Sequence, residues 1–139
     1  MRSASARASA ELIFGLVAIA AAFGVVFNFA HDHDQQWAHA AATTGGDPSR
    51  GEAMFIDYGC GSCHALAHVR KATGKVGPSL DGIAVRAVIA GKLANTPDNL
   101  QRWIRDPQTV TPGTDMPDLR VGERDARDIT AFLYTRAGG

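Results

Sequence analysis

The chain of 139 residues is poor in cysteine and has no excess of either charge. It holds only Cys60 and Cys63, whereas a structural zinc site normally takes four Cys or His ligands. The 14 basic and 14 acidic residues balance, so no net charge points to nucleic acid. A Gly-rich phosphate loop, a Ser/His/Asp arrangement, internal repeats and long alternating strands are also missing. These gaps disfavour a zinc protein, a nucleic-acid binder, a phosphate-loop protein and a β-rich fold.

Both cysteines lie in one short motif, Cys60-Gly61-Ser62-Cys63-His64. Two cysteines separated by two residues and followed by histidine are typical of covalent haem attachment. Each thiol adds to one vinyl group of the same porphyrin, and the adjacent imidazole supplies one axial ligand to the iron. A redox dithiol would lie in a βαβ pattern, and a structural disulfide would leave His64 unexplained. The motif therefore predicts one covalently bound haem c.

The second axial ligand is expected from one of three methionines, Met1, Met54 and Met116. Met54 lies only one or two helical turns before Cys60. Met116 stands in a turn-rich loop, Pro112-Gly113-Thr114-Asp115-Met116-Pro117, far along the chain from the attachment motif. The alternative role for a lone methionine is to fill a hydrophobic core. We therefore predict His64 and Met116 as the two iron ligands, a pair that raises the reduction potential and suits electron transfer.

An uncharged apolar run extends over nineteen residues, from Leu12 to Ala30. As a helix it would measure about 28 Å, close to the thickness of a bilayer core. A cleaved signal peptide is the alternative, because Ala38-His39-Ala40 resembles a cleavage site, but its apolar region is usually shorter. A buried globular helix is a third reading, although nothing would cover its apolar surface. We predict a retained anchor helix within residues 1–30.

The charges around this run predict its orientation in a membrane. Arg2 and Arg7 precede it, while Asp32 and Asp34 follow it. Positive flanks stay on the cytoplasmic side, so the rest of the chain is expected on the periplasmic side of the inner membrane. Residues 31–46 are predicted to be a flexible linker that ends in two glycines. Its three histidines, His31, His33 and His39, resemble metal ligands, but a solvated linker explains them as well, and their role stays open.

Residues 47–139 are predicted to form an all-α domain. Asp47-Pro48 and Thr96-Pro97 are helix-start signals, and Asp106-Pro107 is a stop signal. The first helix should end near Gly59, and the last should run from about Glu123 to Arg136. The apolar positions of these helices are spaced to share one face of each helix: Gly51, Phe55 and Tyr58 in the first, Leu100, Trp103 and Ile104 in the second, and Ala126, Ile129, Thr130 and Leu133 in the last.

These features resemble the class I, mitochondrial-type cytochrome c family. The resemblance rests on the attachment motif, Gly77-Pro78-Ser79-Leu80, Thr114-Asp115-Met116-Pro117 and the terminal Asp128-Ile129-Thr130-Ala131-Phe132-Leu133. It covers about two thirds of the chain. The stretch from Asn95 to Pro107 is similar, more narrowly, to the cytochrome c domain fused to subunit II of some haem-copper oxidases. Unlike those proteins, this chain has no copper-binding domain and only one apolar span.

The resemblance implies a small cytochrome c fold in which the first and last helices cross around the haem. It implies that the Pro78 carbonyl accepts the N–H of His64, and that Leu80 and Trp103 line the haem, the latter near a propionate. Trp103 would otherwise be a core residue. Arg86 is a further candidate propionate partner, although a surface charge is the simpler reading.

The expected function is therefore electron transfer without enzymatic bond breaking. The chain is predicted to be a membrane-anchored monohaem cytochrome that carries single electrons between respiratory membrane complexes, in the direction of a terminal oxidase. Two alternatives stay open. One is a fixed haem subunit of a larger oxidase or dehydrogenase complex. The other is a haem enzyme that acts on peroxide or a small gas after Met116 leaves the iron.

Overall fold

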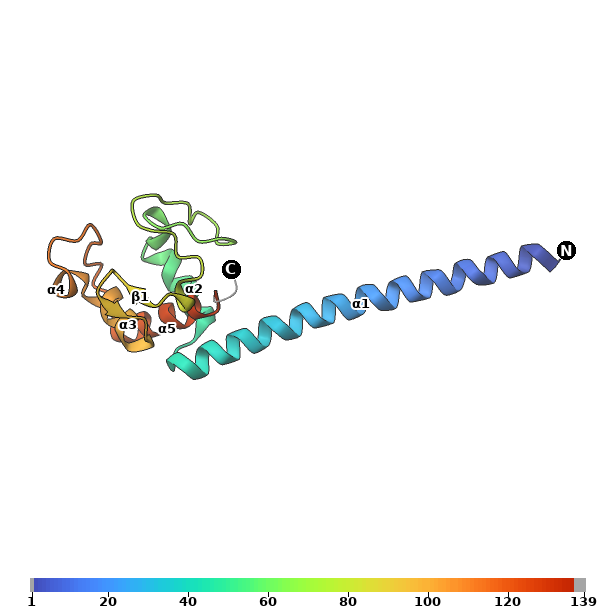
Figure 1. Cartoon of the computed structure of the whole chain (residues 1–139), viewed down its shortest axis with the longest axis horizontal. Coiled ribbons are helices and arrows are strands. Elements are labelled where there is room, and N and C mark those ends of the chain that lie inside the picture. Colours follow the sequence, from blue (N-terminus) through green and yellow to red (C-terminus); the bar gives the residue numbers. More distant parts are fainter. Residues whose placement is uncertain (1, 137–139) are drawn as a thin grey trace. The chain divides into compact units, whose positions relative to one another are not determined.

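The computed structural model describes residues 2–136, with side chains from residue 11 onward, and it is mostly helical (Figure 1). The all-α class predicted from the sequence is confirmed. The chain divides into two compact units, one up to Gln35 and one from Gln36 onward. The elements follow in the order α1 (Arg2–Thr44), α2 (Pro48–Asp57), the 3-10 turns Cys60–Ser62 and Ile83–Val85, β1 (Val88–Ile89), β2 (Leu93–Ala94), α3 (Pro97–Arg105), α4 (Pro107–Val110) and α5 (Glu123–Tyr134).

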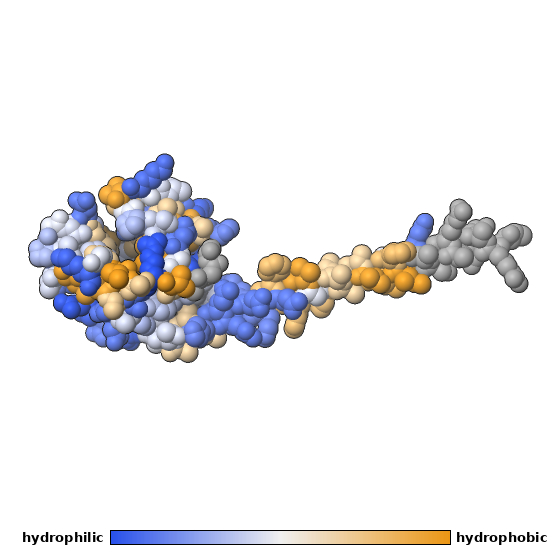
Figure 2. All heavy atoms as spheres, in the orientation of Figure 1, coloured by the Kyte–Doolittle hydropathy of each residue, from blue (hydrophilic) through white to orange (hydrophobic). Residues whose placement is uncertain are grey.

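The apolar run from Leu12 to Ala30 lies within α1 and leaves its large side chains exposed. Phe14 and Phe23 are 76% and 72% exposed, and the run is the orange part of the long helix in Figure 2. By length and composition, the stretch Glu11–Thr44 could cross a bilayer, a test that an N-terminal signal sequence passes as well. The side chains of Arg2 and Arg7, on which the predicted orientation depends, lie outside the described residues.

Residues 31–44 are helical, whereas the sequence analysis expects a flexible coil there. They continue α1 to Thr44, and Gly45 then leaves the helix with a φ of +71°. The run Ala40-Ala41-Ala42 favours this continuation, because alanine is the strongest helix former. Ala40 is buried, and its carbonyl accepts the Thr44 hydroxyl at 2.7 Å. The expected coil is therefore wrong at these positions, while the division into anchor, linker and domain stays a prediction.

The closest helix pair of the second unit is formed by α2 and α5. Asp47 caps α2 by accepting the N–H groups of Ser49 and Arg50, as its position before Pro48 predicts. A side chain at Gly51 would overlap the backbone carbonyl of Asp128. Only glycine permits this approach, which makes Gly51 the contact point of the two helices.

A second link joins the start of α2 to α5. The buried carboxylate of Asp128 accepts the Asp47 N–H at 2.8 Å and forms an ion pair with Arg50. A buried charge needs both an opposite charge and hydrogen bonds to offset its lost hydration, and Asp128 has both. The sequence alone gives Asp128 no role, because its partner Asp47 lies 81 positions away.

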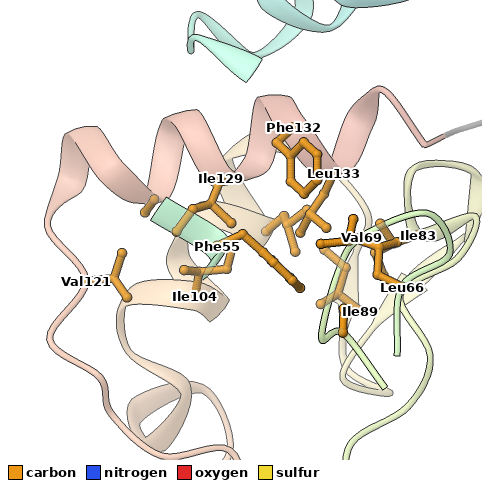
Figure 3. Close-up of a cluster of buried hydrophobic side chains, with 13 residues drawn as sticks. Phe55, Leu66, Val69, Ile83, Ile89, Ile104, Val121, Ile129, Phe132 and Leu133 are labelled. Carbon is orange, nitrogen blue, oxygen red and sulfur yellow. The ribbon is translucent and has the colours of Figure 1, made fainter. Parts of the chain in front are cut away.

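The hydrophobic core combines side chains of α2, α3 and α5 with side chains of the connecting segments, among them Leu66, Ile89 and Val121 (Figure 3). Phe55 and Phe132 are 1% and 0% exposed, with ring centroids 5.7 Å apart and planes tilted by 57°. Such tilted pairs add to the stability gained from area burial. The core comprises Phe55, Leu66, Val69, Ala72, Ile83, Ile89, Leu100, Ile104, Val121, Ala126, Ile129, Phe132 and Leu133.

Two short elements were not predicted from the sequence. Residues 107–110 form α4, one turn of helix that Asp106 caps by accepting the Thr109 N–H at 3.0 Å. Strands β1 and β2 pair as a small antiparallel hairpin, in which Ala90 and Gly91 turn with positive φ. Both elements are too short for periodicity to reveal them, since a period needs several repeats to be recognised.

Candidate functional site

The second unit encloses a cavity of about 450 Å³ on whose walls the predicted site residues meet. Its volume lies in the range of small-molecule and cofactor sites. Phe55, Leu100, Ile104 and Leu133 contribute an apolar wall from the three main helices. All seven residues singled out from the sequence line it: Cys60, Cys63, His64, Pro78, Leu80, Trp103 and Met116. Residues 56 positions apart, such as Cys60 and Met116, therefore share one site.

The two cysteines are presented by a tight turn that follows α2. Gly59 enters it with a φ of +71°, and the Cys60 carbonyl accepts the N–H groups of both Cys63 and His64, at 3.3 and 3.0 Å. Both thiols are free, so the pair is not a disulfide here. Burial raises the pKa of the Cys60 thiol to about 11. A reactive redox cysteine needs the opposite shift, which makes a thioredoxin-like role a poor fit.

His64 is oriented by a hydrogen bond on one side of its ring. Its Nδ1 lies 2.7 Å from the Pro78 carbonyl oxygen, as the resemblance implies. A carbonyl only accepts, so Nδ1 carries the proton and Nε2 keeps its lone pair for a metal ion. A Cβ atom at Gly77 would lie 2.6 Å from Nδ1 and 2.9 Å from Nε2. Any larger residue at position 77 would displace the ring from this orientation, a constraint that the sequence alone does not reveal.

The loop beyond His64 is held by Asp81 and Arg86. Asp81 accepts the Ala67 N–H and the Ser79 hydroxyl, each at 2.7 Å, and these bonds lower its pKa. The Arg86 guanidinium lines the cavity and donates to the carbonyls of Ser79 and Asp81, at 2.6 and 2.9 Å. Arg86 is therefore a structural cation of this loop as well as a wall residue. No local pattern around Asp81 announces its role.

The facing wall carries Met116 in the loop 111–119. The Met116 side chain is half-buried and lines the cavity, whereas Met54 is absent from its walls and packs against the core instead. The structure thus separates the two methionines as the sequence analysis does. Gln108, to which the sequence alone gives no role, makes three hydrogen bonds to this segment.

Besides Phe55, the aromatic residues Trp103 and Tyr58 line the cavity. Trp103 is half-buried on α3. The Tyr58 hydroxyl donates to Asp125 of α5 at 2.9 Å, and this bond raises the pKa of Tyr58. Tyr58 was predicted only as a helix-face residue, because its partner is 67 positions away.

The donor set and the wall chemistry fit a haem c better than a bare metal ion. One imidazole nitrogen, one thioether and two thiols converge on a largely apolar cavity, and no group of three His, Cys, Asp or Glu side chains suited to a metal ion occurs among residues 11–136. The Thr111 hydroxyl lines the cavity and is buried without a hydrogen-bond partner in the described part of the chain. Buried hydroxyls are normally paired, and a polar group bound in the cavity would satisfy this one.

Comparison with known proteins gives two kinds of relatives. Cytochrome c oxidase subunit 2 of Alkalihalophilus pseudofirmus is 36% identical over 86 residues, covering 61% of this chain and 24% of that subunit. The same subunit of Bacillus sp. PS3 is 40% identical over 89 residues, with 61% and 25% covered. Cytochrome c2 of Rhodopila globiformis is 36% identical over 104 residues, covering 65% of this chain and 93% of that protein. No solved structure matches significantly.

The matched part of the oxidase subunits is only about a quarter of their length, whereas cytochrome c2 is matched almost throughout. The family model for cytochrome c matches residues 48–137, which contain the cavity and all seven predicted site residues. A c-type cytochrome engaged in electron transfer, with haem c as its cofactor, is the function that this family implies. The chain belongs to the cytochrome c family.

Proposed function

We propose that the chain binds one haem c and carries single electrons. Cys60 and Cys63 would hold the porphyrin through two thioether bonds, His64 would bind the iron through Nε2, and Met116 would bind it through sulfur. The observation that supports this assignment most directly is that these four side chains line one cavity. The bound haem supplies the one-electron chemistry, because its iron alternates between two oxidation states.

The remaining wall residues orient the ligands and exclude water. The hydrogen bond from His64 to the Pro78 carbonyl strengthens the imidazole as a ligand. Leu80 and Trp103 add apolar surface, which lowers the local polarity and disfavours the more highly charged, oxidised haem. Trp103 also carries one N–H donor, which suits a propionate at the cavity edge. We expect a relatively high reduction potential from this combination.

The protein acts as an electron carrier rather than as an enzyme. A haem enzyme needs an open position on the iron, and the His64/Met116 pair leaves none. The alternative, turnover of peroxide or a small gas, would need Met116 to leave the iron readily. The contacts that hold the Met116 loop argue against this reading.

The N-terminal part of α1 serves as a retained single-pass anchor in the inner membrane, with the haem domain on the periplasmic side. The exposed apolar run from Leu12 to Ala30 supports this proposal. An anchor concentrates the haem domain at neighbouring membrane proteins without any new contact. The partners are respiratory membrane complexes that donate and accept electrons, with a terminal oxidase as the acceptor.

A fixed subunit of an oxidase complex is the second candidate. The similarity to the C-type domain of proteins named cytochrome c oxidase subunit 2 favours it. Co-purification in mild detergent separates the two candidates. A shuttle should leave the oxidase during purification, whereas a subunit should stay with it in a constant ratio.

Absorption spectra of the purified protein test the haem assignment. The oxidised protein should be low-spin and show the weak far-red band of a methionine-ligated haem. Met116→Ala should abolish this band and lower the midpoint potential, while Met54→Ala, a change outside the cavity, should leave both unchanged. A high-spin wild type, or a Met116→Ala spectrum equal to that of the wild type, would contradict the assignment of His64 and Met116 as the iron ligands. Either result would favour the alternative of a haem enzyme.

A deletion tests the anchor separately. The chain without residues 1–30, exported by a cleavable signal, should be soluble and spectrally normal but should deliver electrons to membranes more slowly. Recovery of the native protein in the soluble fraction, beginning at Ala41, would show that the apolar run is a signal peptide.

A further inference from the structure

The Met116 loop is held by the side chain of Gln108. We propose that Gln108 is a positioning residue that keeps Met116 seated and thereby limits access of external ligands to the iron. This inference rests on the proposed function, since it takes Met116 as the axial ligand. Neither the family resemblance nor the sequence pattern singles out Gln108.

One side-chain amide makes three hydrogen bonds to the loop. Gln108 Nε2 donates to the carbonyls of Thr114 and Met116, each at 2.9 Å, and Oε1 accepts the Gly113 N–H at 3.2 Å. The orientation of the amide is chemically determined, because the flipped amide would place Oε1 against two carbonyl oxygens. Gln108 thus uses both donors and its acceptor on a single segment, including the backbone of Met116 itself.

The backbone of Gln108, from which these three hydrogen bonds are made, is held firmly in the fold. Gln108 lies on α4, whose first residue, Pro107, is fully buried. Asp106 caps the turn through the Thr109 N–H, and the Thr111 N–H donates to the Pro107 carbonyl at 2.8 Å. The Gln108 backbone is therefore fixed to the core, and its side chain transfers that rigidity to the loop.

The loop has little else to hold it. Its other hydrogen bonds are local: the Thr114 N–H donates to the Thr111 carbonyl at 3.1 Å, and the Met116 N–H donates to the Thr114 hydroxyl at 3.5 Å. Pro112, Gly113, Asp115 and Pro117 are exposed. Loss of the Gln108 contacts would free the loop without disturbing the α2–α5 pair, so Met116 would leave the iron more often.

Competition by external imidazole measures how often Met116 leaves. Gln108→Ala removes all three bonds, and Gln108→Glu keeps the acceptor but cannot donate to either carbonyl. Because each lost bond contributes a modest net free energy, we expect the haem-loaded Gln108→Ala protein to bind imidazole about tenfold more tightly than the wild type. Gln108→Glu should show an increase in the same direction. Gln101→Glu, the same change on α3, should bind imidazole as the wild type does.

A readout that is independent of the iron ligands accompanies this titration. The Gly113 amide should exchange its hydrogen slowly in the wild type and Gln101→Glu, and faster in Gln108→Ala. Wild-type imidazole affinity in both Gln108 variants, with unchanged Gly113 exchange, would overturn the proposal. A lowered unfolding midpoint with unchanged imidazole affinity would also overturn it, because that result describes a purely structural residue.

Failure of the proposed function gives a different result. If Met116 is not a ligand, the wild type lacks the far-red band and Met116→Ala binds imidazole no more tightly than the wild type. If Gln108→Ala does not fold, Gln108→Glu and the hydrogen-exchange rate of the Gly113 amide in the wild type still test the role of Gln108. Fast exchange of this amide in the wild type would overturn the proposal.

Discussion

The two walls of the cavity are built in different ways. The wall that carries His64 is held by backbone hydrogen bonds between separate segments of the chain. The N–H groups of Gly74, Gly77, Leu66 and Leu80 donate to the carbonyls of Gly61, Cys63, Ala72 and Ala65, respectively, at 2.8–3.0 Å. The wall that carries Met116 has only short-range backbone bonds, from the Thr111 N–H to the Pro107 carbonyl and from the Thr114 N–H to the Thr111 carbonyl, and a weak bond from the Met116 N–H to the Thr114 hydroxyl at 3.5 Å. The Gln108 side chain adds three further hydrogen bonds to it.

This difference indicates which ligand can move. Backbone bonds depend little on residue identity, so the His64 wall should tolerate most side-chain changes that create no steric overlap. A wall held by one side chain can be released by one substitution. The position of His64 should therefore be insensitive to most substitutions, whereas the position of Met116 should depend on a single side chain.

Removal of a core side chain that supports both walls should weaken them together. Phe55→Ala deletes a buried ring that contacts Phe132 and lines the cavity. We expect a loss of about 3–5 kcal/mol in the free energy of unfolding, as for other large aromatic deletions in a core. Denaturant unfolding of the haem-loaded protein measures it, with Ile56→Ala, at a position 51% exposed, as the control. A loss below about 1 kcal/mol would mean that the helix pair does not support the walls.

A substitution at Gly77 should break the His64 wall alone. The methyl group of Gly77→Ala would displace the imidazole and break its hydrogen bond to Pro78. Loss of such a bond typically weakens metal binding by about 10–100-fold. Haem content and spin state of the purified protein measure the effect. Gly122→Ala, whose new atom would meet nothing closer than 3.8 Å, serves as the control, and normal low-spin spectra in both variants would refute the steric argument.

A substitution at Gly113 should affect mainly the Met116 wall. Gly113 has a φ of +79° with open space around it, so alanine costs only backbone strain, about 1–2 kcal/mol. The far-red band of Gly113→Ala should disappear at a lower temperature than in the wild type. Asparagine tolerates this conformation better, and Gly113→Asn should lie in between. If the spectral signals of His64 ligation were lost at the same temperature as the far-red band, the two walls would not be independent.

Acid should have the smallest effect and should reach both walls. Hydrogen bonds from the Ala67 N–H and the Ser79 hydroxyl lower the pKa of Asp81, and those from the Thr109 hydroxyl and N–H lower the pKa of Asp106. A carboxyl group with a depressed pKa stabilises the fold above its unfolded value of about 3.9, and this contribution is lost as pH falls through the folded value. The unfolding midpoint should therefore decrease below about pH 4.

Asparagine variants isolate this contribution of the two carboxylates. Asp81→Asn with Asp106→Asn should reduce the slope of the unfolding midpoint between about pH 5 and pH 3. Both groups are exposed, so solvent screening keeps the difference small. An unchanged slope in the double variant would assign the acid sensitivity to other carboxylates.

Local signals in the sequence predicted much of the fold. The caps at Asp47 and Thr96 and the helical stripe of α5 predicted elements that the structure confirms, because each depends on neighbouring residues. The coil expected for residues 31–46 was wrong over 31–44, where alanine-rich sequence and burial of Ala40 favour helix. Turns as short as α4 leave no periodic signal.

The sequence by itself determined which chemistry we propose for the site. The spacing of Cys60, Cys63 and His64, together with a methionine in a turn-rich loop, predicts a haem and its ligand types without any contact information. Only the tertiary structure decided how those ligands are held. The Gly77 backbone beside the imidazole, the Asp128 link across 81 positions and the three bonds of Gln108 depend on where distant or irregular segments meet. Such contacts follow from packing of the whole chain, which no local pattern of residues encodes.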